Sequence, residues 1–104
     1  MLQQKVAKDL LTLFPQLEPD DVKSTSMGAA GEDVQLSPAA RRLFPYQIEC
    51  KNKATSQLHT YYKQALSHGK HEPVVICKMD RDIVLATVSW EHFQKLIKEN
   101  QNRD

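Results

Sequence analysis

The apolar residues of this chain come in short segments whose spacing switches several times between helical and strand-like. Over residues 1–14 they recur every three or four positions, which predicts an amphipathic helix that Pro15 ends. The same period over 56–67 predicts a second long helix, with Gly69 as its expected C-terminal cap. It returns once more after Ser89, a suitable helix N-cap, and so predicts a final helix.

Strand-like segments lie between these helices. Two runs rich in β-branched residues, 74–77 and 83–88, are separated by a charged turn and predict a hairpin. Alternation over 34–36 predicts a short strand, and Ser37 with the following proline predicts the cap and first turn of a short helix. The segment 46–50 is expected to form another short strand.

This order of elements predicts a mixed α/β (α+β) fold in which helices flank a single mixed β-sheet. A chain of 104 residues has room for one domain, so 1–104 is expected to be a single domain. Within it we expect an N-terminal helix over 1–14, a flexible loop over 15–32 that is rich in Pro, Ser and Gly, and a core over 33–97.

Charge and composition limit the classes of function. The formal net charge is only +1, so any affinity for a polyanion has to come from local clusters of basic residues. Charged residues interrupt the first helix before any apolar run reaches the length of a signal-peptide core or a membrane span, which predicts a soluble, cytoplasmic protein. Cys50 and Cys77 are too few for a disulfide framework and are expected to be buried, reduced strand residues.

Three charged residues suggest a catalytic constellation. If 46–50 is a strand that pairs with 34–36, Glu49 and Lys51 share one face and the carboxylate of Asp33 lies beside Glu49. Two neighbouring carboxylates repel each other unless a cation lies between them. Mg²⁺ binds one or two carboxylates together with waters and substrate phosphate, so this arrangement would suit phosphodiester hydrolysis. The alternative is a surface ion pair between Glu49 and Lys51.

The surrounding sequence strengthens the first interpretation. The stretch GAAGEDVQLSP, the later FPYQIECKNK and a following helix that contains Gln64 resemble the PD-(D/E)xK nuclease superfamily over about residues 24–97. The chain is most similar to its small single-domain enzymes of phage origin and to archaeal-type Holliday junction resolvases. The resemblance implies a restriction-endonuclease-like core, a single nuclease domain over 1–104 with the catalytic core in 33–97, and a Mg²⁺ or Mn²⁺ cofactor.

The resemblance also assigns roles to individual residues. It makes Asp33 and Glu49 metal ligands together with the carbonyl oxygen of Cys50, Lys51 the catalytic lysine, and Gln64 a helix residue that faces the active site. Many relatives add a glutamate from the first helix, where this chain offers only an aspartate. The acids that could substitute for it are Asp9, Asp20, Asp21 and Glu32.

Contacts to DNA are expected from basic residues and from the loop. Arg41, Arg42 and Lys53 would bind phosphates, although each arginine could equally belong to a solvated helix face. Ser26 and Gly28 belong to a stretch of small residues that would let the backbone approach DNA closely. The paired tyrosines 61 and 62 are expected to lie half in the core, in preference to forming a base-stacking platform.

Three functions therefore remain open. The first is a metal-dependent endodeoxyribonuclease that acts on branched, nicked or otherwise processed DNA as a homodimer, since cutting both strands needs two active sites. The second is a nucleic-acid-binding module that keeps the nuclease fold but cuts weakly or needs a partner. The third is a structural or inhibitory interaction protein in which Glu49 and Lys51 are merely paired.

Overall fold

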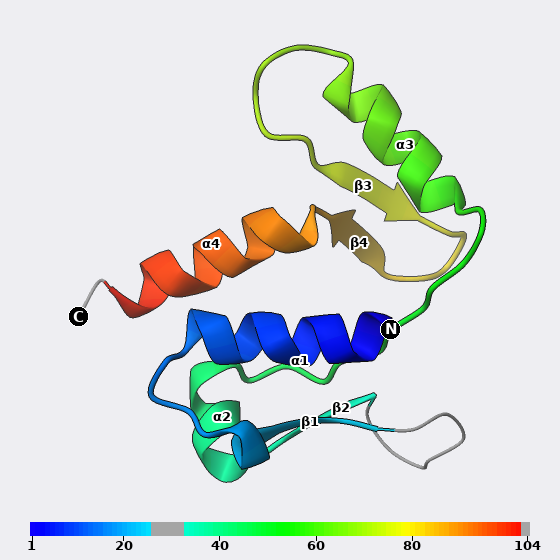
Figure 1. Cartoon of the computed structure of the whole chain (residues 1–104). Coiled ribbons are helices and arrows are strands. Elements are labelled where there is room, and N and C mark those ends of the chain that lie inside the picture. The colour runs from blue at the N-terminus through cyan, green and yellow to red at the C-terminus, as the bar shows by residue number, and fades with distance from the viewer. Residues whose placement is uncertain (26–32, 103–104) are drawn as a thin grey trace. The chain divides into compact units, whose positions relative to one another are not determined.

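In the computed structural model, which describes residues 1–25 and 33–102, the chain divides into two units, Met1–Asn52 and Lys53–Asp104 (Figure 1). Each unit has its own helices and its own two-stranded antiparallel sheet. The α+β class is therefore confirmed, but the strands of the described residues form two small sheets where a single mixed sheet was expected. The restriction-endonuclease-like core and a single nuclease domain over 1–104 stay predictions.

Unit 1 opens with helix α1 (Leu2–Leu13), as the apolar period predicts. Its last turn closes when the backbone N–H of Phe14 donates to the carbonyl of Leu10 over 3.0 Å. The helix packs against strands β1 (Val22–Ser24) and β2 (Val34–Leu36). The core of this unit consists of the buried side chains of Val6, Ala7, Leu10, Phe14, Val22, Val34, Ala40 and Phe44.

The prediction of a loop over 15–32 is wrong for residues 19–24, which form a short helix and a strand. Residues Pro19–Asp21 form a short 3₁₀ helix, η1, in which Glu18 and Asp21 cap each other's backbone N–H groups. Strand β1 follows at once and pairs with β2 in a register that places Val22 opposite Leu36. Burial of Val22 favours this pairing despite the polar residues around it. Residues 26–32 lie outside the described part of the chain.

Helix α2 (Pro38–Leu43) begins as the sequence predicts. The Oγ of Ser37 accepts a hydrogen bond from the backbone N–H of Ala40 over 3.1 Å, and Pro38 occupies the first helical position. The next segment, 46–50, contains no strand. The prediction of a short strand at these residues is therefore wrong. The hydrogen bonds of this segment explain why, and they also build the candidate site.

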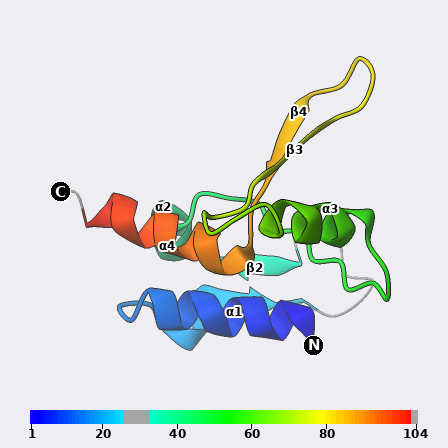
Figure 2. The same ribbon diagram turned by 90° about the horizontal axis from the view of Figure 1, so that it is seen from above.

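Unit 2 contains helix α3 (Gln57–Leu66), the hairpin of β3 (Val75–Lys78) and β4 (Val84–Thr87), and helix α4 (Trp90–Gln101). Figure 2 shows the hairpin as a two-stranded arm, and its strand β3 contacts α3. These elements confirm the expected hairpin and both helices. The Oγ of Ser89 caps α4 by accepting from the backbone N–H of His92 over 3.0 Å.

Two local expectations for unit 2 need correction. Helix α3 is capped by Ser67 and not by Gly69. The Ser67 N–H and hydroxyl donate to the last carbonyls of the helix, the hydroxyl to that of Gln64 over 2.6 Å. Cys77 is only half-buried in β3, as is Cys50 outside any strand, and neither forms a disulfide. Among the described residues, no helix combines the length and apolar character that crossing a bilayer requires.

Candidate active site

Asp33 is held at the start of β2 by backbone hydrogen bonds on both sides. Its carbonyl accepts from the backbone N–H of Thr25 over 3.0 Å and from the Thr25 hydroxyl over 3.1 Å, which extends the β1–β2 pairing by one residue. Its own N–H donates to the carbonyl of Ile48 over 3.2 Å. Asp33 therefore sits between β1 and the 46–50 segment, half-buried.

The carboxylate of Asp33 makes a further contact to the same segment. Its Oδ2 accepts the backbone N–H of Cys50 over 2.5 Å. Between paired strands that N–H would donate to a main-chain carbonyl. Here the side chain of Asp33 takes the place of that carbonyl as the acceptor. At the start of the segment, the Arg41 guanidinium donates to the carbonyl of Tyr46 over 2.5 Å and occupies that acceptor. These two side chains explain why 46–50 lies beside β2 without forming a strand.

Glu49 and Lys51 flank Cys50 and turn to the same side. Their Oε1 and Nζ atoms are 3.2 Å apart, and the side chains are 66% and 69% exposed, respectively. The alternation expected for an extended segment is thus kept for this pair although no strand forms. The contact fits the proposed catalytic pair and equally fits a surface ion pair, since both side chains reach solvent.

The thiol of Cys50 is close to both acids. Burial raises the pKa of this thiol, and the negative charges of Asp33 and Glu49 raise it further. The Oδ2 of Asp33 accepts the Cys50 N–H and Glu49 directly precedes Cys50 in the chain, so both acids lie near this residue. The structure therefore brings Asp33, Glu49 and Lys51 together in unit 1.

The donor atoms of this cluster suit a hard cation better than a soft one. Two carboxylates and the carbonyl of Cys50 are oxygen donors of the kind that Mg²⁺ and Mn²⁺ prefer, and Mg²⁺ needs no more than two carboxylates from the protein. Within residues 1–25 and 33–102, no group of three or more His, Cys, Asp or Glu side chains is arranged to hold a metal ion. A cation bound here would complete its coordination with water or phosphate oxygens.

The acids that could complete the site have other contacts. Asp9 is 2.8 Å from the ammonium of Lys5 on α1. The carboxylate of Asp21 accepts the hydroxyl of Ser37 over 2.6 Å and the N–H of Glu18 over 2.8 Å, and Asp20 lies 3.9 Å from a lysine. These contacts engage Asp9 within α1 and Asp21 at η1, and Glu32 lies outside the described residues.

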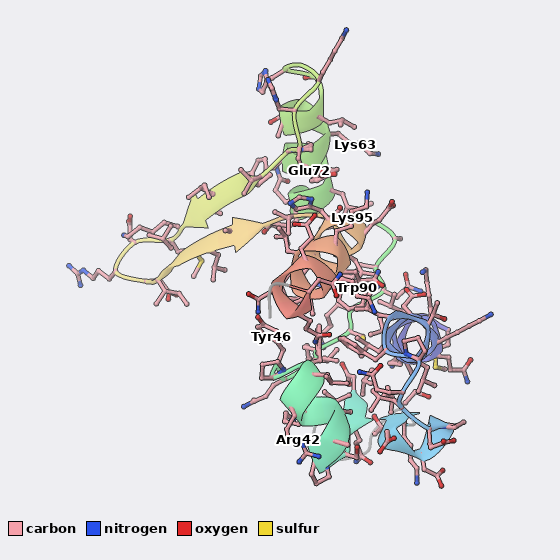
Figure 3. All side chains as sticks on the ribbon, turned by 90° about the vertical axis from the view of Figure 1, so that its left-hand side faces the viewer. Arg42, Tyr46, Lys63, Glu72, Trp90 and Lys95 are labelled. Atoms are coloured by element: carbon pink, nitrogen blue, oxygen red, sulfur yellow. The ribbon has the colours of Figure 1, made fainter. Side chains whose placement is uncertain are left out.

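The remaining predicted site residues are spread over the chain. Arg42 is exposed on α2 (Figure 3), whereas Arg41 is half-buried and bound to Tyr46. Lys53 is exposed at the start of unit 2. Gln64 is an exposed residue of α3 that lines a cavity of about 560 Å³ against β3, within unit 2. Ser26 and Gly28 lie outside the described residues.

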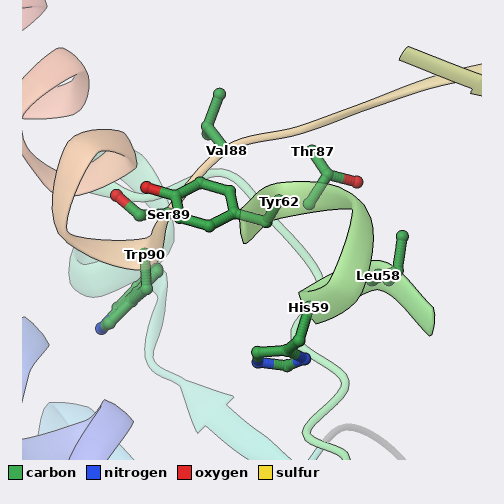
Figure 4. A pocket seen from close by; sticks show the side chains of 7 residues that line it. All are labelled: Leu58, His59, Tyr62, Thr87, Val88, Ser89 and Trp90. Atoms are coloured by element: carbon green, nitrogen blue, oxygen red, sulfur yellow. The ribbon is translucent and has the colours of Figure 1, made fainter. Parts of the chain in front are cut away.

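Unit 2 also contains a cavity that the sequence interpretation missed. Leu58, His59 and Tyr62 of α3 line it together with Ser89 and Trp90 at the start of α4 (Figure 4). The spacing of the three α3 residues gave a usable signal, because positions four apart share a helix face. No sequence pattern indicated that Trp90 lines this cavity. Its position depends on the path of the chain from β4 into α4.

The comparisons with known proteins add no family to this description. Neither a protein-family model, nor a curated protein, nor a solved structure matches the chain.

Proposed function

We propose that residues 33–51 carry the active site of a metal-dependent DNA endonuclease, which hydrolyses phosphodiester bonds. One observation carries the proposal: the hydrogen bond from the Cys50 N–H to the Asp33 carboxylate brings that acid beside the Glu49–Lys51 pair. Two carboxylates and one ammonium thereby lie around the backbone of residues 49–51. The resemblance of GEDV and IECKN to nuclease motifs is an independent reason to assign the same three residues.

Asp33 and Glu49, together with the Cys50 carbonyl, are the residues that would hold Mg²⁺ or Mn²⁺. Such a cation supplies Lewis-acid stabilisation of the phosphate and lowers the pKa of a coordinated water. Lys51 would orient the attacking water and offset the charge that develops on the phosphate oxygens. Its place 3.2 Å from Glu49 keeps the ammonium next to the acids while both remain open to solvent.

Each of the two acids has a compensating partner within the protein. Asp33 accepts an N–H and Glu49 lies against an ammonium, so their mutual repulsion is reduced. This arrangement would let the site persist without a cation and accept one from solvent. The exposed Lys51 ammonium would contact the phosphate.

The two neighbouring arginines of α2 would have different roles. Arg41 positions the 46–50 segment through the carbonyl of Tyr46, whereas Arg42 and Lys53 are exposed and would contact phosphates. Cutting both strands of a duplex would need two sites, so the proposal includes a homodimer. It also places the enzyme in the cytoplasm, where DNA is accessible and thiols stay reduced.

A second candidate function rests on the exposure of the ion pair. Because Glu49 and Lys51 are both about two-thirds exposed, their contact could be a surface pair in a module that binds nucleic acid without cutting it. Such a module would bind DNA in Ca²⁺ yet leave it intact in Mg²⁺ or Mn²⁺.

The deciding experiment is a cleavage assay on linear, nicked and four-way-junction DNA with Mg²⁺, with Mn²⁺ and with EDTA. We expect cleavage only with metal, and its loss in Lys51→Ala while DNA binding in Ca²⁺ is retained. Lys23→Ala is the matched control, because Lys23 is also an exposed lysine of unit 1 in a loose ion pair. Metal-independent cleavage, no cleavage of any substrate, or full activity of Lys51→Ala would overturn the proposal.

A further inference from the structure

The missed cavity in unit 2 is lined by three ring-bearing side chains. It encloses about 340 Å³, and Figure 4 shows His59 and Tyr62 on α3 and Trp90 at the start of α4 around it. Leu58 and Val88 add aliphatic surface. This volume lies near the lower end of the roughly 300–1,000 Å³ typical of ligand pockets, so the cavity suits one flat ring system better than an extended ligand.

A second cavity adjoins the first at His59, which lines both. It encloses about 350 Å³ and is lined by Lys53 and Lys63 together with the hydroxyl-bearing residues Thr55, Ser56 and Thr60. Both lysines are exposed. Neither lining includes an aspartate or a glutamate, so this part of unit 2 favours an anion.

The helical period of α3 explains why the two cavities adjoin. Leu58 and Tyr62 are four residues apart and share one row on the helix, and His59 and Lys63 form the neighbouring row. One row presents rings and aliphatic carbon, and the next presents a cation. The same few turns of helix therefore offer an aromatic surface and a positive charge side by side.

A nucleotide has the complementary pair of features, because it carries a flat base next to an anionic phosphate. We propose that unit 2 binds one unpaired nucleotide of a DNA strand, with its base in the ring-lined cavity and a phosphate at Lys53 and Lys63. Stacking on aromatic side chains accepts any base, and lysines bind the backbone whatever the sequence. A paired base is stacked inside the duplex, so the site selects single-stranded or frayed DNA. This function goes beyond cleavage because it uses neither Asp33, Glu49 and Lys51 nor a metal.

The chain provides its own reporter for this site. Trp90 is the single tryptophan of the sequence, so its fluorescence reports on the ring-lined cavity. The full chain is titrated in EDTA with pentadeoxyadenylate, with a five-residue abasic phosphodiester, with deoxyadenosine monophosphate and with a blunt duplex. We expect saturable quenching by pentadeoxyadenylate, affinity that falls as salt rises, binding at least about tenfold weaker for the abasic strand, and measurable binding of the mononucleotide, which carries one base and one phosphate.

Substitutions separate the two halves of the site. Tyr62→Leu removes a stacking ring and should weaken pentadeoxyadenylate binding about tenfold, and Lys63→Ala should reduce the slope of log affinity against log salt by about one. His59 is exposed, so we expect His59→Ala to fold normally. Because His59 lines both cavities, this variant should also weaken pentadeoxyadenylate binding. Tyr61→Leu and Lys23→Ala are the matched controls, because neither residue lines either cavity.

Several results would overturn the proposal. They are an absence of quenching, equal binding of the abasic strand, duplex binding as tight as single-strand binding, and equal losses in Tyr61→Leu and Tyr62→Leu. Because the titration is done in EDTA, a negative result here leaves metal-dependent cleavage untouched. A failed cleavage assay likewise leaves this site intact.

Discussion

The backbone N–H of Cys50 donates to the Oδ2 of Asp33 over 2.5 Å and so joins two residues 17 positions apart in the sequence. This contact fixes the distance between the first acid of the candidate site and the segment that carries the other two charges. It also makes the site sensitive to the kind of side chain at position 33, since an acceptor oxygen has to remain there.

Asp33→Asn and Asp33→Ala are therefore expected to differ in stability, but both should fail to bind the metal ion. The asparagine oxygen can still accept from Cys50, so metal-free Asp33→Asn should melt close to the parent, whereas Asp33→Ala leaves a partly buried N–H without its partner and should lose about 1–3 kcal/mol. We expect Mn²⁺ to raise the melting temperature of the parent, and both variants should lose that rise. Asp20→Asn, at a 95% exposed side chain, is the control. A parent whose melting temperature ignores millimolar Mn²⁺ would contradict the metal assignment.

The Glu49–Lys51 pair is expected to contribute little to stability. A double-mutant cycle with Glu49→Gln and Lys51→Ala, measured by urea unfolding in EDTA, should give a coupling energy below about 1 kcal/mol, because both side chains are exposed. Each single variant should nevertheless abolish metal-dependent cleavage. The pair Glu91–Lys95 on α4, with its atoms 4.0 Å apart, gives a comparison cycle with no effect on cleavage. A coupling well above 1 kcal/mol with unaltered cleavage would assign Glu49 and Lys51 a structural role.

The neighbouring arginines of α2 should separate into a positioning residue and a DNA contact. Arg41→Ala removes the donor to the Tyr46 carbonyl and should cost about 1 kcal/mol of stability together with a fall in cleavage rate. Arg42→Ala should leave the melting temperature unchanged but lower DNA affinity evenly across sequences and reduce the salt slope by about one. Arg41→Lys, which cannot reproduce the guanidinium geometry, is a useful further variant. Identical behaviour of both alanine variants would refute this division.

The pH dependence of unit 1 should include a contribution from Asp21. Its pKa lies below the ordinary value of 3.8, because the Ser37 hydroxyl and the Glu18 N–H donate to the charged carboxylate. A lowered pKa in the folded state stabilises the fold above the unfolded-state value, and this stability disappears as the pH falls through the folded-state value.

Urea unfolding of Asp21→Asn and the parent measures this contribution. The parent should be the more stable protein near neutral pH, and the difference in unfolding free energy should shrink below the ordinary pKa of 3.8. Asp20→Asn, whose nearest lysine is 3.9 Å away, should show a much smaller difference at every pH. A difference for Asp21→Asn that is constant with pH would disprove the electrostatic origin.

The elements that the sequence predicts correctly are those with local signals. Ser37 and Ser89 cap their helices through hydrogen bonds to residues three positions on, so a window of a few residues contains the whole interaction. The β3–β4 hairpin is equally local. The class of fold followed from these elements. The proximity of Glu49 and Lys51 followed from the alternation of an extended segment, which is kept although 46–50 forms no strand.

The missed elements depend on contacts between distant residues. Strand β1 is three residues long and mostly polar, and it becomes a strand only through pairing with β2. The 46–50 segment has strand-like residues, but the carboxylate of Asp33 and the guanidinium of Arg41 occupy groups that a ladder would need. No pattern within either segment contains that information.

The β3–β4 hairpin has a practical consequence for handling the protein. In the described residues these strands pair only with each other, which leaves an outer edge on each, and Ile76, Ile83 and Val84 are all at least 60% exposed. Exposed aliphatic strands with open edges recruit further strands and aggregate. We expect turbidity that grows with protein concentration, and a gatekeeper charge such as Val84→Lys should suppress it and raise the yield of dispersed protein.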